Sequence, residues 1–358
     1  MEDSGLRLLR IENLRCLSNV EINVDPHRNV IYGANGAGKT SILEAIYFLS
    51  RGKSFRAGDN SKLIKSAEQD LTVFGEVFTD DRITRLGIKA FRGGTEIHLD
   101  GQKGTRISEL AAALPVQVID PESHMLIQGG PAVRRQFLDW GVFHVEHDFL
   151  LNWQKYKRLL QQRNAAIKLK QARDMAQIWD KELISTALMV DRARRAYLEQ
   201  LMPLIVSICN ELLGIDVKCI YRQGWSDEDV FEEALKESWG RDSLMGFTQV
   251  GPHRAEIAIQ ADGMAARNRL SRGQQKLLSI AMVLAQSLFV AQSQSRKVVL
   301  LVDEPAAELD KDHQERLLVS LDKPELQLFI SALDGDGVIA QSPAKMFHVK
   351  RGEVSTLI

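Results

Sequence analysis

The stretch GANGAGKT, residues 33–40, constrains the fold of this chain more than any other. It follows the apolar run NVIY and precedes the amphipathic stretch SILEAIYFL, so it lies between an expected strand and an expected helix. That is the context of a phosphate-binding loop, whose glycines let backbone N–H groups surround the α- and β-phosphates of a nucleotide. It predicts an α/β fold. The candidate contacts are Gly33, Ala34, Asn35, Gly36, Ala37, Gly38, Lys39, Thr40 and Ser41.

Such a loop needs a metal and a second carboxylate. Lys39 is expected to reach the β- and γ-phosphate oxygens, and the hydroxyl of Thr40 to bind Mg²⁺. The run KVVLLVDEP, residues 297–305, predicts a strand buried on both faces that ends in Asp303 and Glu304. Asp303 would support the Mg²⁺ ion, and Glu304 would orient or deprotonate the attacking water. The pattern therefore indicates nucleotide hydrolysis.

The stretch LSRGQQK, residues 270–276, contains a second possible phosphate contact. Ser271 has the profile of a helix N-cap, and Gln274 completes a capping box for the helix that runs through KLLSIAMVLAQSLFV. A helix N-terminus with a serine hydroxyl, and with Gly273 allowing close backbone approach, can also sense a γ-phosphate. The residues alone favour the cap and leave the phosphate contact open.

The periodicity of the chain predicts two lobes, as its 358 residues also suggest. Short apolar runs separated by turns predict strands in the first third, and residues 130–213 have helical periodicity. Strand and helix patterns alternate again from about residue 255. We expect an ATPase-type lobe made of residues 1–120 and 250–358, whose two ends share a sheet, with a helical lobe of residues 121–249 inserted between them.

Charge and composition narrow the possible partners and location. The chain has 46 Lys and Arg against 47 Asp and Glu, so a polyanion must bind to a local patch. Its three cysteines lack metal-type spacing, which favours reduced thiols in a cytoplasm. The apolar stretches are too short for a bilayer, and the first residues are not a secretory signal. We expect a cytoplasmic protein without a membrane partner.

The order of these motifs resembles that of ABC-type ATPases. The phosphate loop, LSRGQ, the strand ending in DE and AAELD at residues 306–310 follow one another as in that superfamily. There, the signature of one subunit covers the ATP that the phosphate loop of the other holds. The resemblance thus implies an ATP-dependent homodimer. It also implies that Ser271, Gly273 and Gln274 contact a neighbour's phosphate, and that Asp310 faces across the interface.

Two longer stretches look like signatures of the RecF recombination-repair ATPases: PESHMLIQGGPAVRRQFLD at 121–139 and AAELDKDHQERLL at 306–318. RGKSFRAGD and VGPHRAEI are similar to that family too, and the resemblance covers essentially the whole chain. It implies a head like those of Rad50 and SMC proteins that binds ATP and DNA. It also implies that the protein works with RecO and RecR to load recombinase at single-strand gaps. Read without the family, 121–139 is a turn and a helix with solvated arginines that pair with Asp139.

Two departures from the wider ABC pattern argue against fast, transport-coupled turnover, so we expect slow hydrolysis. With the RecF resemblance, we expect this hydrolysis to be DNA-dependent. No histidine follows the strand LQLFIS, where transporter cassettes have their switch histidine, and no coupling glutamine is evident after VQVID, because Gln117 precedes the apolar pair. One alternative is the ATP-binding cassette of a membrane transporter. Another is a small-molecule P-loop kinase, which leaves Ser271 to Gln274 and Asp310 unexplained.

The predicted DNA contacts are basic side chains of the helical lobe. Residues 149–173 contain seven basic residues and no acid, and a helical wheel places the basic residues away from an apolar stripe that includes Trp153 and Tyr156. Such a face is either solvated or, given the resemblance, a DNA contact. The candidates are Arg163, Lys170 and Arg173, with Arg51, Lys53 and Arg56 as a second group. His253 and Arg254 could touch nucleotide, DNA or the interface.

Overall fold

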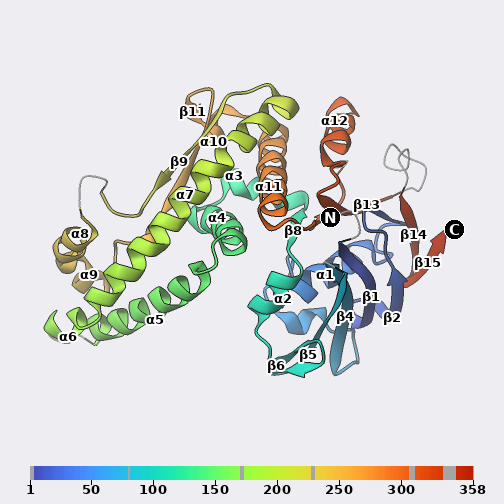
Figure 1. Cartoon of the computed structure of the whole chain (residues 1–358), viewed down its shortest axis with the longest axis horizontal. Coiled ribbons are helices and arrows are strands. Elements are labelled where there is room, and N and C mark those ends of the chain that lie inside the picture. Colours follow the sequence, from blue (N-terminus) through green and yellow to red (C-terminus); the bar gives the residue numbers. More distant parts are fainter. Residues whose placement is uncertain are drawn as a thin grey trace. The chain divides into compact units, whose positions relative to one another are not determined.

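The computed structural model describes residues 4–79, 81–169, 173–226, 230–305, 311–333 and 344–357. The chain divides into two compact units (Figure 1). The first combines Met1–Ser123 with Val283–Ile358, and the second is His124–Met282. Residues 250–282 were expected to complete the ATPase lobe, but they belong to the second unit. The reason is that the strand Glu256–Ala261 pairs with Val217–Arg222, which lies in that unit.

One sheet of the first unit joins the two ends of the chain, as the sequence predicted. Its order is β15-β14-β3-β13-β12-β8, and all neighbours are parallel except β14 and β15. Every residue of β12 and β13 is buried, which explains the uninterrupted apolar run of β12 and the largely apolar sequence of β13. The strands are β3 (Arg28–Tyr32), β8 (Val116–Ile119), β12 (Val298–Val302), β13 (Leu326–Ala332), β14 (Lys345–Lys350) and β15 (Glu353–Leu357).

The second sheet of this unit is antiparallel and has the order β2-β1-β4-β5-β6-β7. β4 alternates buried and half-buried residues, as expected for a sheet with one face in the core. The other face carries cross-strand ion pairs such as Lys89 with Asp70. A tight turn at Asp100 and Gly101 joins β6 to β7. The strands are β1 (Gly5–Leu14), β2 (Leu17–Asn23), β4 (Asp70–Thr79), β5 (Arg82–Phe91), β6 (Gly94–Leu99) and β7 (Gln102–Lys103).

Helix α1 (Lys39–Arg51) is the centre of the first unit's core. Its buried residues, such as Ile46 and Phe48, share one cluster with Val73 of the antiparallel sheet and Phe329 of the parallel sheet. Packing against both sheets fixes the start of α1 at the end of β3. The unit also contains α2 (Ile107–Ala113), α12 (Lys311–Leu321) and the C-terminal part of α11 (Arg272–Gln294).

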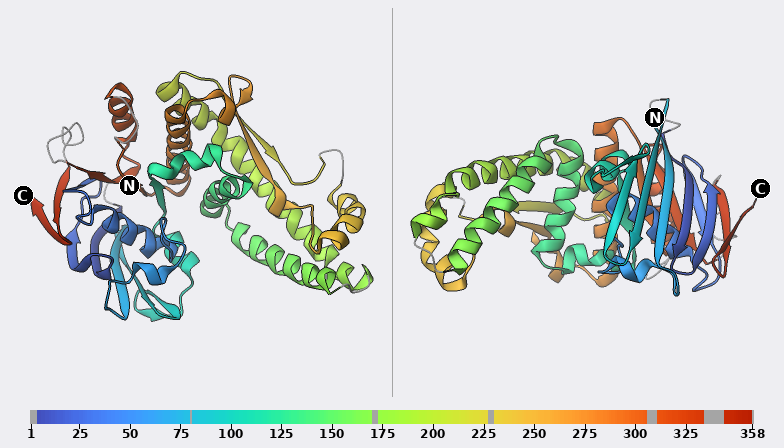
Figure 2. Two further views of the ribbon diagram at one scale, coloured as in Figure 1. Left: turned by 180° about the vertical axis from the view of Figure 1, so that it is seen from behind. Right: turned by 90° about the horizontal axis from the view of Figure 1, so that it is seen from below.

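The second unit is mainly helical, as predicted from residues 130–213. Its long helices α5 and α7 lie side by side (Figure 2), and residues such as Tyr156 and Leu183 share a core there. A small sheet has the order β11-β10-β9, made of β9 (Val217–Arg222), β10 (Glu256–Ala261) and β11 (Met264–Ala265). The helices are α3 (Met125–Gln128), α4 (Pro131–Val145), α5 (Phe149–Lys168), α6 (Arg173–Gln177), α7 (Asp180–Leu213), α8 (Phe231–Glu237), α9 (Trp239–Met245), α10 (Ala266–Arg269) and the start of α11.

Among the described residues, one helix has the length and hydropathy that a bilayer crossing would require. This helix is α11, and 78% of its most apolar window is buried inside the protein. A helix that is apolar on most sides is expected in a protein core, so burial accounts for its composition.

Candidate nucleotide site and nucleic-acid contacts

The phosphate loop lies between β3 and α1, as the sequence predicted. Gly33 has φ 148°, and a Cβ atom there would lie 2.2 Å from the carbonyl oxygen of Val349. Gly38, at the N-cap of α1, has φ 119°. Both positions require glycine, because a side chain would clash at the first and strain the backbone at both. The loop is thus held against β14. In this conformation the N-terminus of α1 is placed to contact a phosphate.

Lys39 places a buried cation in this loop. Its side chain is 4% exposed, and its Nζ donates to the carbonyl oxygens of Gly33 at 2.7 Å and Ala34 at 3.1 Å. An ammonium group has three donors and no acceptor, so these carbonyls satisfy two of its three hydrogens. The positive charge is therefore positioned beside the N-terminus of α1, where both favour a bound anion.

The two side chains predicted to bind Mg²⁺ lie in contact. The hydroxyl of Thr40 donates to Oδ1 of Asp303 at 3.0 Å, although the residues are 263 positions apart in the sequence. Asp303 follows β12 at the same edge of the sheet as the loop, because both strands run parallel. A hydroxyl and a carboxylate are the oxygen ligands that Mg²⁺ prefers. The residues present therefore fit a magnesium ion.

Ser331, at the end of β13, is a site residue that the sequence reasoning missed. Its hydroxyl donates to Oδ1 of Asp303 at 2.8 Å and accepts from the backbone N–H of Glu304 at 2.9 Å. Glu304 has φ 50°, an unusual backbone conformation for a residue with a side chain, and its side chain is exposed. Ser331 thus holds both acids in place. Ser331 reaches Asp303 because β13 pairs with β12, and this pairing cannot be read from the sequence.

Asp120 adds a third carboxyl group to this edge. It follows β8, the neighbour of β12, and its Oδ1 accepts from the hydroxyl of Ser123 at 3.1 Å. Burial raises the pKa of Asp120, and the negative charge of Asp303 adds to the increase. The run VQVID, which ends in an acid as KVVLLVDE does, was the available signal. Negative charge therefore accumulates where a divalent cation would offset it.

The capping box predicted for LSRGQQK is confirmed. The backbone N–H of Ser271 donates to Oε1 of Gln274 at 3.0 Å, and the backbone N–H of Gln274 donates to the hydroxyl of Ser271 at 3.3 Å. Both residues are exposed, and Gly273 is half-buried between them. The N-terminus of α11 is thus well formed and accessible, as a phosphate contact also requires.

Some of the predicted contacts lie within the described residues and others lie outside them. Asp310 and Lys170 are outside the described residues, and Arg173 begins α6 with a side chain that is not described. The second basic group lies at the end of α1, where Arg51 stacks 5.9 Å from the ring of Tyr47. Lys53 and Arg56 are exposed, so this group stays a candidate DNA contact.

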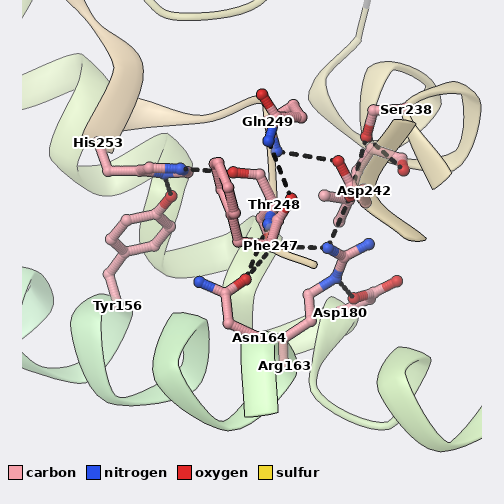
Figure 3. A network of polar contacts seen from close by, with 11 residues as sticks. Tyr156, Arg163, Asn164, Asp180, Ser238, Asp242, Phe247, Thr248, Gln249 and His253 are labelled. Atoms are coloured by element: carbon pink, nitrogen blue, oxygen red, sulfur yellow. Dashed lines mark hydrogen bonds and ion pairs between the residues drawn. The ribbon is translucent and has the colours of Figure 1, made fainter. Parts of the chain in front are cut away.

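The prediction that Arg163 contacts DNA is wrong. Its side chain is 1% exposed, and it donates to Asp180 at 2.9 Å, to Asp242 at 2.8 Å and to the hydroxyl of Thr248 at 2.6 Å (Figure 3). Its guanidinium also stacks 5.7 Å from the ring of Trp239. A buried charge needs such partners. Here the partners lie inside the second unit, and they neutralise the charge of Arg163 and accept its hydrogen bonds.

His253 belongs to the same polar network. Its Nε2 lies 3.1 Å from the carbonyl oxygen of Thr248, which can only accept, so Nε2 carries the proton (Figure 3). Its Nδ1, 2.6 Å from the Tyr156 hydroxyl, then accepts. Burial lowers the pKa of His253 to about 4, and burial raises the pKa of Tyr156. Both side chains are therefore neutral, and their hydrogen bond ties the turn that carries His253 to α5.

The arginines of residues 121–139 are not the solvated pair that the sequence suggested. Arg134 donates to both carboxylate oxygens of Glu256, each at 2.7 Å, and to the carbonyl oxygen of Gly129 at 2.6 Å. Asp139 pairs instead with the fully buried Arg194 at 2.8 Å. The stretch that looks like a family signature thus ties α4 to β10 and α7.

A phosphate loop whose threonine contacts an acid at the end of a parallel neighbouring strand, followed by a capped LSRGQ helix, defines an ABC-type P-loop ATPase head. A family model described as the RecF/RecN/SMC N-terminal domain matches residues 5–355. The chain is 38% identical to the DNA replication and repair protein RecF of Shewanella pealeana, over 99% of each chain. The chain therefore belongs to the RecF family.

Solved structures agree with this assignment. A recombination mediator RecF bound to ATP, described as part of the RecFOR pathway, has 26% sequence identity and a TM-score of 0.90, over 99% of this chain and 98% of that one. An SMC head bound to a domain of ScpA has 19% identity and a TM-score of 0.62, which shows a shared fold.

Replacing Arg163 tests its structural role. Arg163→Ala leaves the fully buried Asp242 without its cation, which should lower the free energy of unfolding by about 3–5 kcal/mol. The matched control is Arg158→Ala, which removes an exposed arginine from the same helix and should change it by about 0.5 kcal/mol or less. Denaturant titration measures both variants, and equal effects would contradict the assignment.

The half-buried, neutral His253 should make stability depend on pH. The pKa of His253 is lowered from 6.5 to about 4, so its contribution is fully present above pH 6.5 and is lost as pH falls toward 4. The loss should be on the order of 3 kcal/mol. Unfolding free energies at pH 7.5 and pH 4.5 measure it. His253→Gln should reduce this difference, whereas His147→Gln, at an exposed histidine, should preserve it. An unchanged difference in His253→Gln would count against the account.

Proposed function

We propose that this protein is an ATP-dependent DNA-binding repair ATPase that dimerises on ATP. It would bind gapped DNA at the junction of single strand and duplex, and help RecO and RecR load recombinase there. The observation that carries the proposal is the contact of Thr40 with Asp303 beside the phosphate loop. The RecF relatives and the ATP-bound RecF structure support it.

The described residues of the first unit supply the parts of a hydrolytic site. Lys39 and the N-terminus of α1 would bind the phosphates of ATP, and Thr40 and Asp303 would hold Mg²⁺. When bound, the metal offsets the negative charge that develops on the phosphates. Ser331 keeps Asp303 and the backbone of Glu304 in place, so that the exposed Glu304 carboxylate can orient or deprotonate the water.

The proposed dimer uses the start of α11 in trans. Ser271 and Gln274 cap this helix and remain exposed, and a helix N-terminus carries a partial positive charge. These residues, with Gly273, would contact the γ-phosphate on the partner's loop, and Asp310 would face the same interface. Binding of ATP then joins two heads.

Hydrolysis is proposed to be weak and stimulated by DNA. In the sequence no histidine follows β13, and Ser331 occupies the end of that strand in contact with Asp303. Work on DNA would place the protein in the cytoplasm. The relatives that match the whole chain are replication and repair proteins, so the transporter alternative is not supported.

Ser271 offers a test of the trans contact that leaves the fold intact. Aspartate is as good an N-cap as serine, so Ser271→Asp should keep the stability of α11. Its carboxylate would repel the partner's γ-phosphate, so the variant should bind ATP and stay monomeric. Ser271→Thr keeps the hydroxyl and is the control that should still dimerise. Sedimentation with ATP measures both, and a parental dimer of Ser271→Asp would refute the contact.

Glu304 and Lys39 test the catalytic roles and the dependence on DNA. Gapped duplex DNA should raise the rate of ATP hydrolysis of the parent protein. Glu304→Gln should bind ATP but hydrolyse it about 10²-fold or more slowly, because a general base is lost. Lys39→Ala should fail to bind nucleotide at all. Hydrolysis by Glu304→Gln at the parental rate would mean that another residue activates the water.

A further inference from the structure

An excess of arginines surrounds the turn VGPHR in the second unit. Two of them are neutralised, because Arg134 pairs with Glu256 and Arg194 pairs with Asp139. Four cations against two carboxylates leave two positive charges, those of Arg135 and Arg254. No acid among the residues that the structure describes forms an ion pair with either. The cluster consists of Arg134, Arg135, Asp139, Arg194, Arg254 and Glu256.

Arg135 is half-buried without a counter-ion. One of its terminal nitrogens donates to the carbonyl oxygen of Ala255 at 2.8 Å. Burial lowers the pKa of Arg135, and the nearby cations Arg194 and Arg254 also lower it. A guanidinium has five donors, so most of those on Arg135 have no acceptor within the described part of the chain. An anion beside it would supply both acceptors and the missing charge.

Arg254 stands next to it on a rigid turn. The side chain is exposed, and its guanidinium lies 5.1 Å from the ring of Phe247. The turn itself is fixed, because Arg194 donates to the carbonyl oxygen of Pro252 at 2.7 Å. The neutral His253 is held by Tyr156 and by the carbonyl of Thr248 (Figure 3). The two arginines are thus held in place before any ligand arrives, which lowers the entropic cost of binding.

We propose that Arg135 and Arg254 together bind a phosphate group of the DNA backbone. The inference rests on the proposed DNA binding and adds its place in the second unit. Planar guanidinium groups match phosphate oxygens in pairs, and two uncompensated cations suit a group with at least one negative charge. Phosphate contacts position DNA without reading its sequence, so affinity should not depend on base order.

The test is the salt dependence of duplex binding. Arg254→Gln removes an exposed cation and should leave the fold unchanged, and Arg135→Gln is the second variant, checked for a parental unfolding midpoint. Removal of one phosphate interaction should make the slope of log affinity against log salt shallower by about 0.9. The control is Arg192→Gln on α7. Its exposed side chain lies two positions before the buried Arg194, hence on the opposite side of the helix, and the parental slope should persist.

The outcomes separate this site from the function on which it rests. If the parent binds no duplex or gapped DNA, the proposed function fails. If the parent binds and Arg254→Gln keeps its slope, this site is wrong and DNA binding stands. A third arm adds inorganic phosphate alone. Thermal protection by phosphate that Arg254→Gln abolishes, with no change in the DNA slope, would show a site for free anions and would overturn the DNA assignment.

Discussion

The hydrogen bond from Thr40 to Asp303 is the interaction on which the nucleotide site depends. It joins the first turn of α1 to the end of β12, across 263 positions of sequence. Two structural features bring these residues together: α1 is buried between two sheets, and the strands β3, β13 and β12 run parallel. Because the carboxyl ends of parallel strands meet at one edge, the loop, Ser331, Asp303 and Asp120 converge there. The packing of α1 against the parallel strands therefore forms the core of the unit and also positions the residues of the nucleotide site.

The second unit uses much of its positive charge for its own structure. Arg163, Arg134 and Arg194 each pair with acids inside the unit, and two of the three are essentially fully buried. A charge that is satisfied in this way is not available to DNA. The arginines left without an acid, Arg135 and Arg254, are for that reason the informative ones. Ligand binding by this unit depends on which cations its fold leaves uncompensated.

Local patterns in the sequence were sufficient for much of the site. The phosphate loop, the strand ending in Asp303 and the capping box of Ser271 each involve residues a few positions apart, so their geometry follows from short-range rules. The role of Ser331 depends on strand order and could not be found in this way. Asp120 ends an apolar run, as Asp303 does, but the pairing of β8 with β12 that brings it to the site is a long-range contact. Arg163 was misplaced because it lies seven residues after Tyr156, on the same buried face of α5, and not on the opposite side of the helix. The unit boundary shifted because the pairing of β10 with β9 is a long-range contact.

The proposed dimer contains a composite site, built from the phosphate loop of one chain and the start of α11 of another. Mixing two inactive variants tests it most directly. Lys39→Ala lacks a working loop and Ser271→Asp lacks a working signature, so neither should hydrolyse ATP alone. A mixed dimer would contain one intact site, formed by the loop of the Ser271→Asp chain and the α11 of the Lys39→Ala chain. Mixing should restore part of the DNA-stimulated hydrolysis. No recovery in an equimolar mixture shown to contain mixed dimers would contradict the composite site.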